Sequence, residues 1–431
     1  MSKLEEQLES CMMSAPRRPV YGPVRLLREA EVSKRKTGVG AAVVALWVLV
    51  CMAVAQGQTI ELSIALGDTN QEDGIHLGSQ GDFDTELVVV NGVEARRTGN
   101  GQVLPSEDGN EIRDTYMQFS VDDALLFKGE PTPRVQLRVE YYDLGTDNFV
   151  IQYDASSTGG AFGDGRFTST SRVTKVNSGK LKVATFSIDD AYFGNRDNGA
   201  DFRIDGLGDG PETIRRVAVL LLAEGVDFEE DLSLKYEQVW GTEQAELIVR
   251  YGDVDNLGVG WPEGFAPFSG ETTPEHDIVW LVDPDDAEGT DRIMVVSSYD
   301  GWTGDATDGY TASTSRPSNE PCEILIAYTA PAGGVVSAIL QVFADDFQSP
   351  VWRSSFQVTI NGLRVPELED VLNALDQTGP VGKLITFPLP RRVVASMQTG
   401  ELRIFVDDPE TGAGDGFAFD FFRLLLNPVE Q

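Results

Sequence analysis

Residues 134–155 read RVQLRVEYYDLGTDNFVIQYDA and give the clearest indication of the fold. In their first part, Val135, Leu137, Val139 and Tyr141 alternate with polar or charged residues. This alternation is typical of antiparallel strands that bury one face. The four residues LGTD at 144–147 separate the two runs and have the composition of a turn, so the stretch predicts a β-hairpin.

The same alternation recurs along the chain from Thr59 onward. It is found at residues 60–66, 247–251, 324–328, 356–360 and 402–406, with turns rich in Gly, Asn and Asp between the runs. Only residues 365–377 have apolar side chains at helical spacing, and this helix would be short. The sequence therefore predicts an all-β chain that forms two tandem jelly-roll β-sandwich domains.

An internal similarity supports two domains. Residues 185–222 and 386–426 both run from a Thr-Phe strand through a surface turn into a strand with Arg-Ile, and then through a Gly/Asp loop to a final apolar strand. Such a repeated order of features is the signature of a duplicated unit. Residues 224–244 are rich in acidic side chains and are predicted as the linker. The expected domains are residues 56–240 and 241–431.

A leader, residues 1–55, precedes the first strand. Its apolar core, residues 39–55, follows Lys34, Arg35 and Lys36 and ends in Ala-Val-Ala at 53–55. A basic region, an apolar stretch and a small-x-small exit describe a secretory signal peptide. An uncleaved signal anchor is the alternative, and residues 39–55 would then be the only membrane contact. The signal peptide and the signal anchor both predict a secreted or cell-surface protein. After cleavage its one cysteine would be Cys322, which can form no internal disulfide.

Composition excludes several classes of function. The chain has 69 acidic and 34 basic residues and a formal charge of −35, so nucleic acid is not an expected partner. Its only histidines are His76 and His276. Two histidines exclude most Ser-His catalytic arrangements and most zinc sites with several imidazole ligands. No catalytic motif is present. A polysaccharide lyase or glycoside hydrolase that uses two carboxylates is the least favoured hypothesis. With so many acidic residues, the presence of an Asp/Glu pair does not indicate a catalytic site.

The ends of both halves resemble a known superfamily. The segment ATFSIDDAYFGNRDNGADFRI at 184–204, which follows YYDLGTDNFVIQYDA at 141–155, is similar to the galactose-binding-like jelly rolls of bacterial exported carbohydrate-binding modules. The segment GDGFAFDFFRLLLNP at 414–428 resembles the closing strand of the same superfamily, with Asp420 between core aromatics. This resemblance implies a two-sheet fold, frequent structural calcium and frequent sugar binding.

Two loops are candidate calcium sites. In the second half, Asp253, Asp255 and Asn256 alternate along a loop bent by glycines, and such a loop offers several oxygens to a hard cation. The acidic residues near the closing strand are candidates to complete the site: Asp407, Asp408, Asp415 and Asp420. In the first half, the corresponding loop contains Asp68 and Asp73, and Asp201 and Asp205 are its candidate partners. The alternative is a set of Asx turns with exposed carboxylates.

Aromatic residues concentrate in the second half. Sugar recognition uses flat rings that stack on pyranose faces, together with polar groups that bind hydroxyls. The candidate ligand-binding residues are Trp261, Trp280, Tyr299, Trp302 and Tyr310, with Phe265 and Phe268 beside Trp261. Tyr153 and Phe162 are weaker candidates in the first half. The alternative is that these loop aromatics only seal the ends of a sandwich.

The sequence thus predicts an exported, non-catalytic binding protein that recognises a glycan or another cell-surface component and is stabilised by calcium. The alternative is a structural or adhesive cell-surface protein with protein partners.

Overall fold

The fold is seen in a computed structural model, which describes residues 50, 59–78, 85–99, 103–105, 111–113, 116–223, 226–276, 286–294, 323–410 and 416–429. These residues form mostly β-strands in several sheets, with a few short helices. Among them, no helix has the length and hydropathy needed to span a bilayer. The predicted leader lies outside this part of the chain, apart from Val50.

Two sheets face each other in the first half. Sheet I has the order β13-β9-β15-β1-β2, and β5 joins the start of β15 with β4 outside it. Its strands are β1 (Ile60–Ala65), β2 (Gln71–Asp73), β4 (Glu86–Val90), β5 (Val93–Arg97), β9 (Val135–Tyr142), β13 (Leu181–Ile188) and β15 (Thr213–Leu221). Sheet II has the order β11-β10-β14-β8-β3, with β12 beside β10. Its strands are β3 (Ile75–Leu77), β8 (Tyr116–Val121), β10 (Asn148–Tyr153), β11 (Thr168–Ser169), β12 (Val173–Thr174) and β14 (Phe202–Asp205). A separate hairpin consists of β6 (Val103–Pro105) and β7 (Glu111–Arg113).

Two further sheets form the second half. Sheet III has the order β16-β17-β25-β20-β23, with β18 beside the start of β25. Its strands are β16 (Tyr236–Trp240), β17 (Ala245–Tyr251), β18 (Ile293–Met294), β20 (Ala338–Asp345), β23 (Gly382–Pro388) and β25 (Phe417–Pro428). Sheet IV has the order β19-β24-β21-β22, with strands β19 (Glu323–Ala327), β21 (Gln357–Ile360), β22 (Leu363–Arg364) and β24 (Glu401–Asp407). The helices are α3 (Ser349–Trp352), α4 (Pro366–Leu372), α5 (Arg391–Ser396) and the 3-10 turn η1 (Met397–Thr399).

The two halves repeat one topology. In sheet I the order β13-β9-β15-β1 matches β23-β20-β25-β17 of sheet III, strand for strand along the chain. In sheet II the order β10-β14-β8 matches β21-β24-β19 of sheet IV. The last strand of each half also has a bulge where it pairs with its neighbour, between Ile214 and Arg216 in β15 and between Phe419 and Phe422 in β25. This agreement supports the duplication that the internal similarity predicts.

The predicted hairpin at residues 144–147 is wrong. Strand β9 pairs with β13 and β15 in sheet I, whereas β10 pairs with β14, β11 and β12 in sheet II, so the turn crosses from one sheet to the other. Ion pairs hold its two ends, Asp143 with Lys182 at 2.9 Å and Asp147 with Lys175 at 2.9 Å. Alternation does not distinguish the two cases, because both a hairpin and a sheet-to-sheet corner join alternating strands through a turn.

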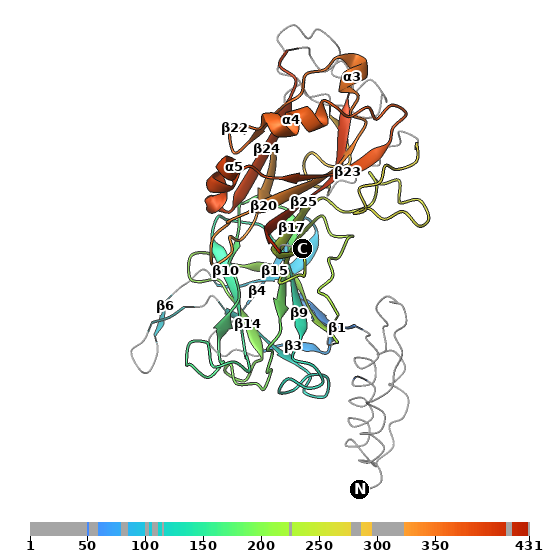
Figure 1. The fold of residues 1–431 in the computed structure, drawn as a ribbon. Coiled ribbons are helices and arrows are strands. Elements are labelled where there is room, and N and C mark those ends of the chain that lie inside the picture. Colours follow the sequence, from blue (N-terminus) through green and yellow to red (C-terminus); the bar gives the residue numbers. More distant parts are fainter. Residues whose placement is uncertain are drawn as a thin grey trace.

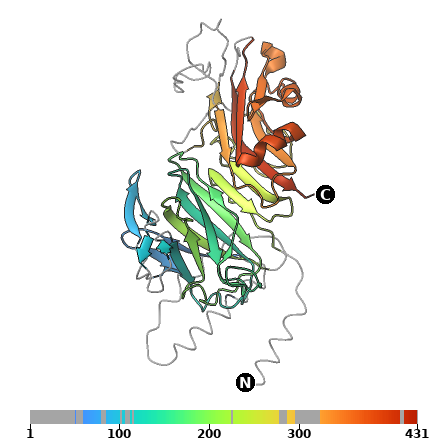
Figure 2. The same ribbon diagram turned by 90° about the vertical axis from the view of Figure 1, so that its left-hand side faces the viewer.

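Each half has its own apolar core, and a third apolar cluster joins the halves. In β15, Val217 and Val219 face the core of the first half, whereas Ala218 and Leu220 pack against Val239 and other residues of sheet III. Both faces of the second part of β15 are therefore buried, which explains the continuous apolar run at 217–221. Figure 1 shows the first half (blue to green) and the second half (yellow to red) one above the other, and the view turned by 90° agrees (Figure 2).

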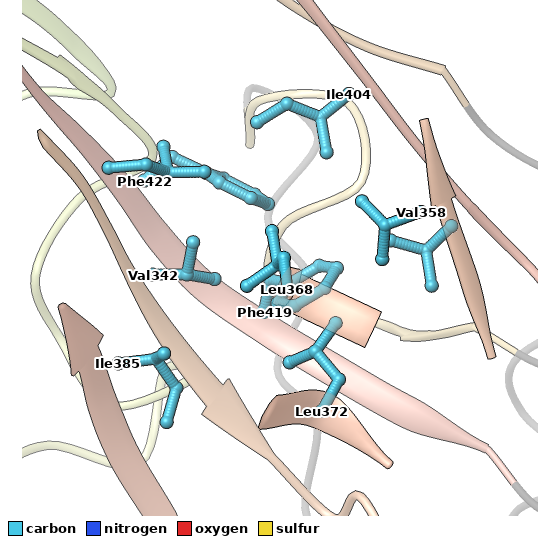
Figure 3. Close-up of a pocket in the computed structure, with 10 residues that line it drawn as sticks. Val342, Val358, Leu368, Leu372, Ile385, Ile404, Phe419 and Phe422 are labelled. Atoms are coloured by element: carbon cyan, nitrogen blue, oxygen red, sulfur yellow. The ribbon is translucent and has the colours of Figure 1, made fainter. Parts of the chain in front are cut away.

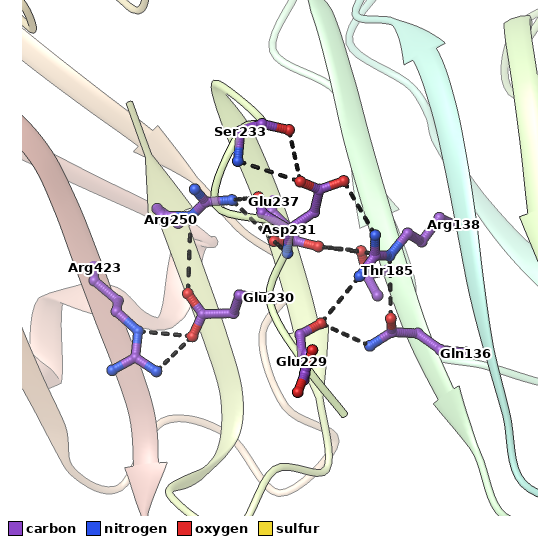
Figure 4. Close-up of polar contacts among 10 residues, drawn as sticks. All are labelled: Gln136, Arg138, Thr185, Glu229, Glu230, Asp231, Ser233, Glu237, Arg250 and Arg423. Atoms are coloured by element: carbon purple, nitrogen blue, oxygen red, sulfur yellow. Dashed lines mark hydrogen bonds and ion pairs between the residues drawn. The ribbon is translucent and has the colours of Figure 1, made fainter. Parts of the chain in front are cut away.

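A buried polar network also crosses this boundary (Figure 4). Glu237 of β16 accepts hydrogen bonds from the Thr185 hydroxyl at 3.1 Å and from Arg250 Nη2 at 2.9 Å. Arg138 of β9 pairs with Asp231 at 3.2 Å. Strand β16 lies inside the segment predicted as the linker, and it pairs along its whole length with β17. The segment that joins the halves is therefore part of sheet III and contacts sheet I directly.

Candidate metal centre

Three segments meet at one end of sheet III. The loop after β17 begins at Gly252, whose φ of +88° and whose close approach to the Asp420 carbonyl leave no room for a side chain: a Cβ would lie 2.6 Å from that oxygen. The second segment, residues 286–291, leads into β18, and the Asp291 N–H donates to the Phe419 carbonyl at 2.9 Å. The third is the start of β25, which carries Asp420. Strand pairing therefore brings together acidic residues from three parts of the chain.

Five aspartates form two overlapping groups. One group consists of Asp255, Asp291 and Asp420, and the other of Asp253, Asp286 and Asp291. Within each group, one carboxylate oxygen per residue lies within 4.8 Å of the others. All five are buried except Asp255, which is partly exposed. Asp291 belongs to both groups and lies between them.

Backbone N–H groups orient part of the cluster. The Asp420 oxygens accept from the N–H of Asn256 at 3.1 Å and of Leu257 at 3.3 Å. An Asp255 oxygen accepts from the Gly258 N–H at 2.8 Å. Asn256 and Leu257 have φ values of 63° and 61°, a left-handed conformation that turns both N–H groups toward Asp420. The loop is thus folded around the carboxylates.

Several buried oxygens in the cluster have no hydrogen-bond donor among the residues that the structure describes. They are both carboxylate oxygens of Asp291, Oδ1 of Asp253 and Oδ1 of Asn256. Asp291 is only 2% exposed. A buried polar group without a partner costs free energy, and a buried carboxylate costs more. A bound cation would satisfy buried oxygens of this kind.

The electrostatics of the cluster agree with this interpretation. Burial raises the pKa of Asp291 far above its usual range, and the nearby carboxylates of Asp420 and Asp255 raise it further. Burial also raises the pKa of Asp420, with Asp255 adding to the effect. Ionisation of all the carboxylates in the cluster is therefore unfavourable without a nearby cation. The donors are all oxygens, which suits a hard cation such as Ca²⁺ or Mg²⁺.

Four of the predicted second-half ligands are thus brought together: Asp253, Asp255, Asn256 and Asp420. Sequence reasoning missed Asp286 and Asp291. Asp407 and Asp408 belong to neither group, and Asp408 instead accepts from the N–H of Ser355 and of Glu410. Asp415 lies outside the described residues.

The predicted site in the first half has a different arrangement. Asp68 and Asp73 are exposed, and neither belongs to a group of three candidate ligands in the part of the chain that the structure describes. The Arg96 guanidinium donates to the Gly67 carbonyl at 3.2 Å and lies 3.4 Å from Asn70 Oδ1. Asp201 and Asp205, the predicted partners, accept hydrogen bonds from backbone N–H groups of their own surroundings. The positive charge beside the loop at 67–70 is therefore the guanidinium of Arg96.

The loop after β17, residues 252–260, is the acidic loop, and Trp261 packs directly against it. Its ring stacks on Phe265 at 5.3 Å between centroids and meets Phe343 edge-on at 5.0 Å, and its Nε1–H donates to the Val254 carbonyl at 2.9 Å. Phe268, which is 37% exposed, packs on Phe421 of β25. Trp280, Tyr299, Trp302 and Tyr310 lie outside the described residues. In the first half, the Tyr153 hydroxyl donates to Asp190, whereas Phe162 is exposed beside Arg166.

One apolar cavity among the described residues is too small for an organic ligand. It lies in the core between sheets III and IV and has a volume of about 10 Å³ (Figure 3). A space of that size holds one water at most, and its lining offers no polar partner for one. The lining residues are Leu340, Val342, Val358, Leu368, Leu372, Ile385, Ile404, Val406, Phe419 and Phe422.

His276 is a loop residue that forms a hydrogen bond. Its Nε2 lies 2.9 Å from the buried carboxylate of Asp345 at the end of β20. This contact ties the segment before residue 277 to sheet III.

Comparisons with known proteins give only weak likenesses. No family model and no curated protein matches the sequence. Among solved structures, the chain is similar to a BuGH86 variant in complex with neoagarooctaose, at 8% identity and a TM-score of 0.20 over 79% of this chain and 37% of that one. It is similar to an exo-beta-agarase at 8% identity and a TM-score of 0.20, over 48% of this chain and 29% of that one. PNGF-II matches at 9% identity and a TM-score of 0.18, over 86% of this chain and 66% of that one. This chain spans well under half the length of the first two, and scores this low carry no argument about function.

Proposed function

We propose that this chain is an exported, non-catalytic recognition protein made of two jelly-roll sandwiches, and that its second half binds calcium. The observation that carries the proposal is the carboxylate of Asp291, which is buried near Asp255 and Asp420 and receives no hydrogen bond on either oxygen from the described part of the chain. In this proposal the cation lies in the Asp255, Asp291 and Asp420 group, with the Asn256 side-chain oxygen beside it.

Calcium is the cation that this donor set suits best. Ca²⁺ takes six to eight oxygen ligands in flexible geometry, whereas Mg²⁺ requires a near-ideal octahedron and keeps several waters. The two acidic groups contain no His or Cys, the ligands that zinc prefers. The predicted export also places the site where weak calcium sites are used.

Bound calcium would stabilise the aromatic loop as well as the sandwich. The cation would hold the loop after β17 against β25, and the Trp261 Nε1–H bond to Val254 attaches the next loop to it. The proposed recognition surface is therefore the segment at 261–268, with a glycan as its partner. This part of the proposal rests on the aromatic residues of the chain and not on the weak structural likenesses.

The calcium proposal is tested by thermal unfolding of the full chain in calcium and in excess chelator. A cation that binds only the folded state raises its stability, by about 2.7 kcal/mol at a concentration a hundred times the dissociation constant. We expect the melting temperature to rise in calcium for the wild type and not for Asp420→Asn. Asp370→Asn, which changes an exposed aspartate of α4, is the matched control and should respond like the wild type. Equal melting temperatures of the wild type in both buffers would refute calcium binding.

The glycan part is tested separately, on a glycan array with and without chelator. We expect binding in calcium that is lost in chelator and weakened by Trp261→Ala. If calcium stabilises the chain but no glycan binds in either state, the structural or adhesive alternative is favoured and the glycan proposal fails.

A further inference from the structure

The second acidic group already faces a positive charge. Lys235 Nζ lies 2.7 Å from Asp253 Oδ2 and 2.7 Å from Asp286 Oδ1. Asp253 and Asp286 belong to the group that shares Asp291 with the proposed calcium group. An ammonium is a compact point charge with three donors, so it can bridge carboxylates much as a small cation does.

Backbone hydrogen bonds fix Lys235 in this place. The Gly252 N–H donates to the Lys235 carbonyl at 2.8 Å, and the Val254 N–H donates to the Leu232 carbonyl at 2.9 Å. The segment before β16 thus runs along the acidic loop, and the Lys235 side chain extends toward Asp253 and Asp286. Its side chain is 22% exposed, while those of its two partners are 8% and 2% exposed. The ammonium therefore covers this group from the solvent side.

The two groups differ in what neutralises them. Lys235 forms ion pairs with Asp253 and Asp286, whereas no described residue donates a hydrogen bond to either oxygen of Asp291. Carboxylates this close need opposite charge nearby, and a divalent cation and an ammonium repel each other when they share the same ligands. One divalent cation and one ammonium therefore suit the five carboxylates, and two divalent cations beside Lys235 do not.

We propose that Lys235 is a built-in cation that fills the second of two overlapping acidic groups, so that the native cluster binds one calcium ion and removal of the lysine charge creates a site for a second. The inference rests on the proposed calcium binding, because it assigns the occupants of the same cluster. It also gives Asp253 a specific part in the native chain, as a partner of Lys235.

The test is the calcium stoichiometry of the full chain, measured by equilibrium dialysis and by calorimetric titration. We expect Lys235→Gln to bind one calcium ion more per chain than the wild type. Lys235→Arg keeps the charge and is the matched control, so its stoichiometry should equal that of the wild type. The double variant Lys235→Gln with Asp286→Asn should lose the additional ion, which locates it in the second group. An unchanged stoichiometry in folded Lys235→Gln would overturn the inference.

A second measurement keeps the test decisive if Lys235→Gln does not fold. In the native background, Asp286→Asn changes only the group that Lys235 fills, so calcium affinity should stay within about threefold of the wild type. Asp420→Asn removes a ligand of the proposed calcium group and should weaken affinity by at least about a hundredfold. Equal losses in the two variants would overturn the role of Lys235. A wild type that binds no calcium would instead refute the proposed function itself.

Discussion

Asp291 combines deep burial with two carboxylate oxygens that receive no hydrogen bond from residues 286–294, 416–429 or any other described segment. Without a cation this arrangement costs stability, since a buried polar group without a partner costs about 1–3 kcal/mol. We expect Asp291→Asn to be more stable than the wild type in chelator by about that amount. In calcium at a thousand times the dissociation constant, the wild type gains about 4 kcal/mol that the variant forgoes, so the variant should then be less stable than the wild type by about 1–3 kcal/mol. Urea unfolding in the two buffers measures both differences.

The change of sign between the two buffers is the distinctive outcome. Asp370→Asn removes an exposed carboxylate and should leave stability within about 0.5 kcal/mol of the wild type in both buffers. If Asp291→Asn is less stable than the wild type in chelator too, the carboxylate has an ordinary structural role.

Part of this site was predictable from local sequence alone. Asp253, Asp255 and Asn256 alternate within a loop bent by glycines, and Asp420 was one of four acidic residues near the closing strand that were named as candidate partners. Asp291 was not, since it reaches the cluster only because β18 pairs with the start of β25. The only local signal is the Gly-Thr-Asp turn at 289–291, and many acidic turns of this chain look the same. The contact is set by tertiary pairing.

The loop after β17 and the aromatic loop at 261–268 form one structural element. Val254, Phe343 and Phe421 form a small apolar cluster against which Trp261 and Phe265 pack. Because the Trp261 ring fills this cluster and its N–H bonds the acidic loop, we expect Trp261→Ala to lower the free energy of unfolding in calcium by about 2–4 kcal/mol. Trp261→Phe keeps a ring but loses the hydrogen bond, and should cost about 1 kcal/mol. Urea unfolding in saturating calcium measures both.

Trp352 provides the control for this prediction. It is a tryptophan of the same half that is 56% exposed at the end of α3. Trp352→Ala should change stability by no more than about 0.5 kcal/mol. Equal effects of the two alanine variants would mean that the Trp261 ring does not hold the loop.

At the level of elements, period-two patterns were the dependable signal. They predicted strands such as β9, β21 and β24, and the helical stripe at 365–377 contains α4. Helix α5 was not expected, because its six residues are too few to display a period. Strand β16 was also missed: Glu237 and Gln238 are buried between the halves, so the strand lacks the apolar and polar alternation of a half-exposed one. The partners of a strand stayed undetermined, as the corner between β9 and β10 shows.

At the scale of the whole molecule, Glu237 lies at the boundary of the two halves with no exposed surface. Burial raises the pKa of its carboxyl from 4.5 to about 7, although Arg250 and Arg138 oppose this shift. A folded-state pKa above the unfolded value means that the folded state binds the extra proton between these two pH values. The contribution of Glu237 to stability is therefore complete below pH 4.5 and is lost as pH rises through about 7.

Glu237→Gln separates this contribution from all others, because glutamine has nearly the same shape and does not titrate. Between pH 5 and pH 8, the free energy of unfolding of the wild type should fall relative to that of Glu237→Gln by up to about 3 kcal/mol. Urea unfolding at several pH values in saturating calcium measures the difference, and the exposed Glu243→Gln should stay parallel to the wild type. A difference between the wild type and Glu237→Gln that does not change with pH would mean that Glu237 remains ionised. Glu237 would then keep its ion pair with Arg250 within sheet III, at 2.9 Å, at every pH of the series.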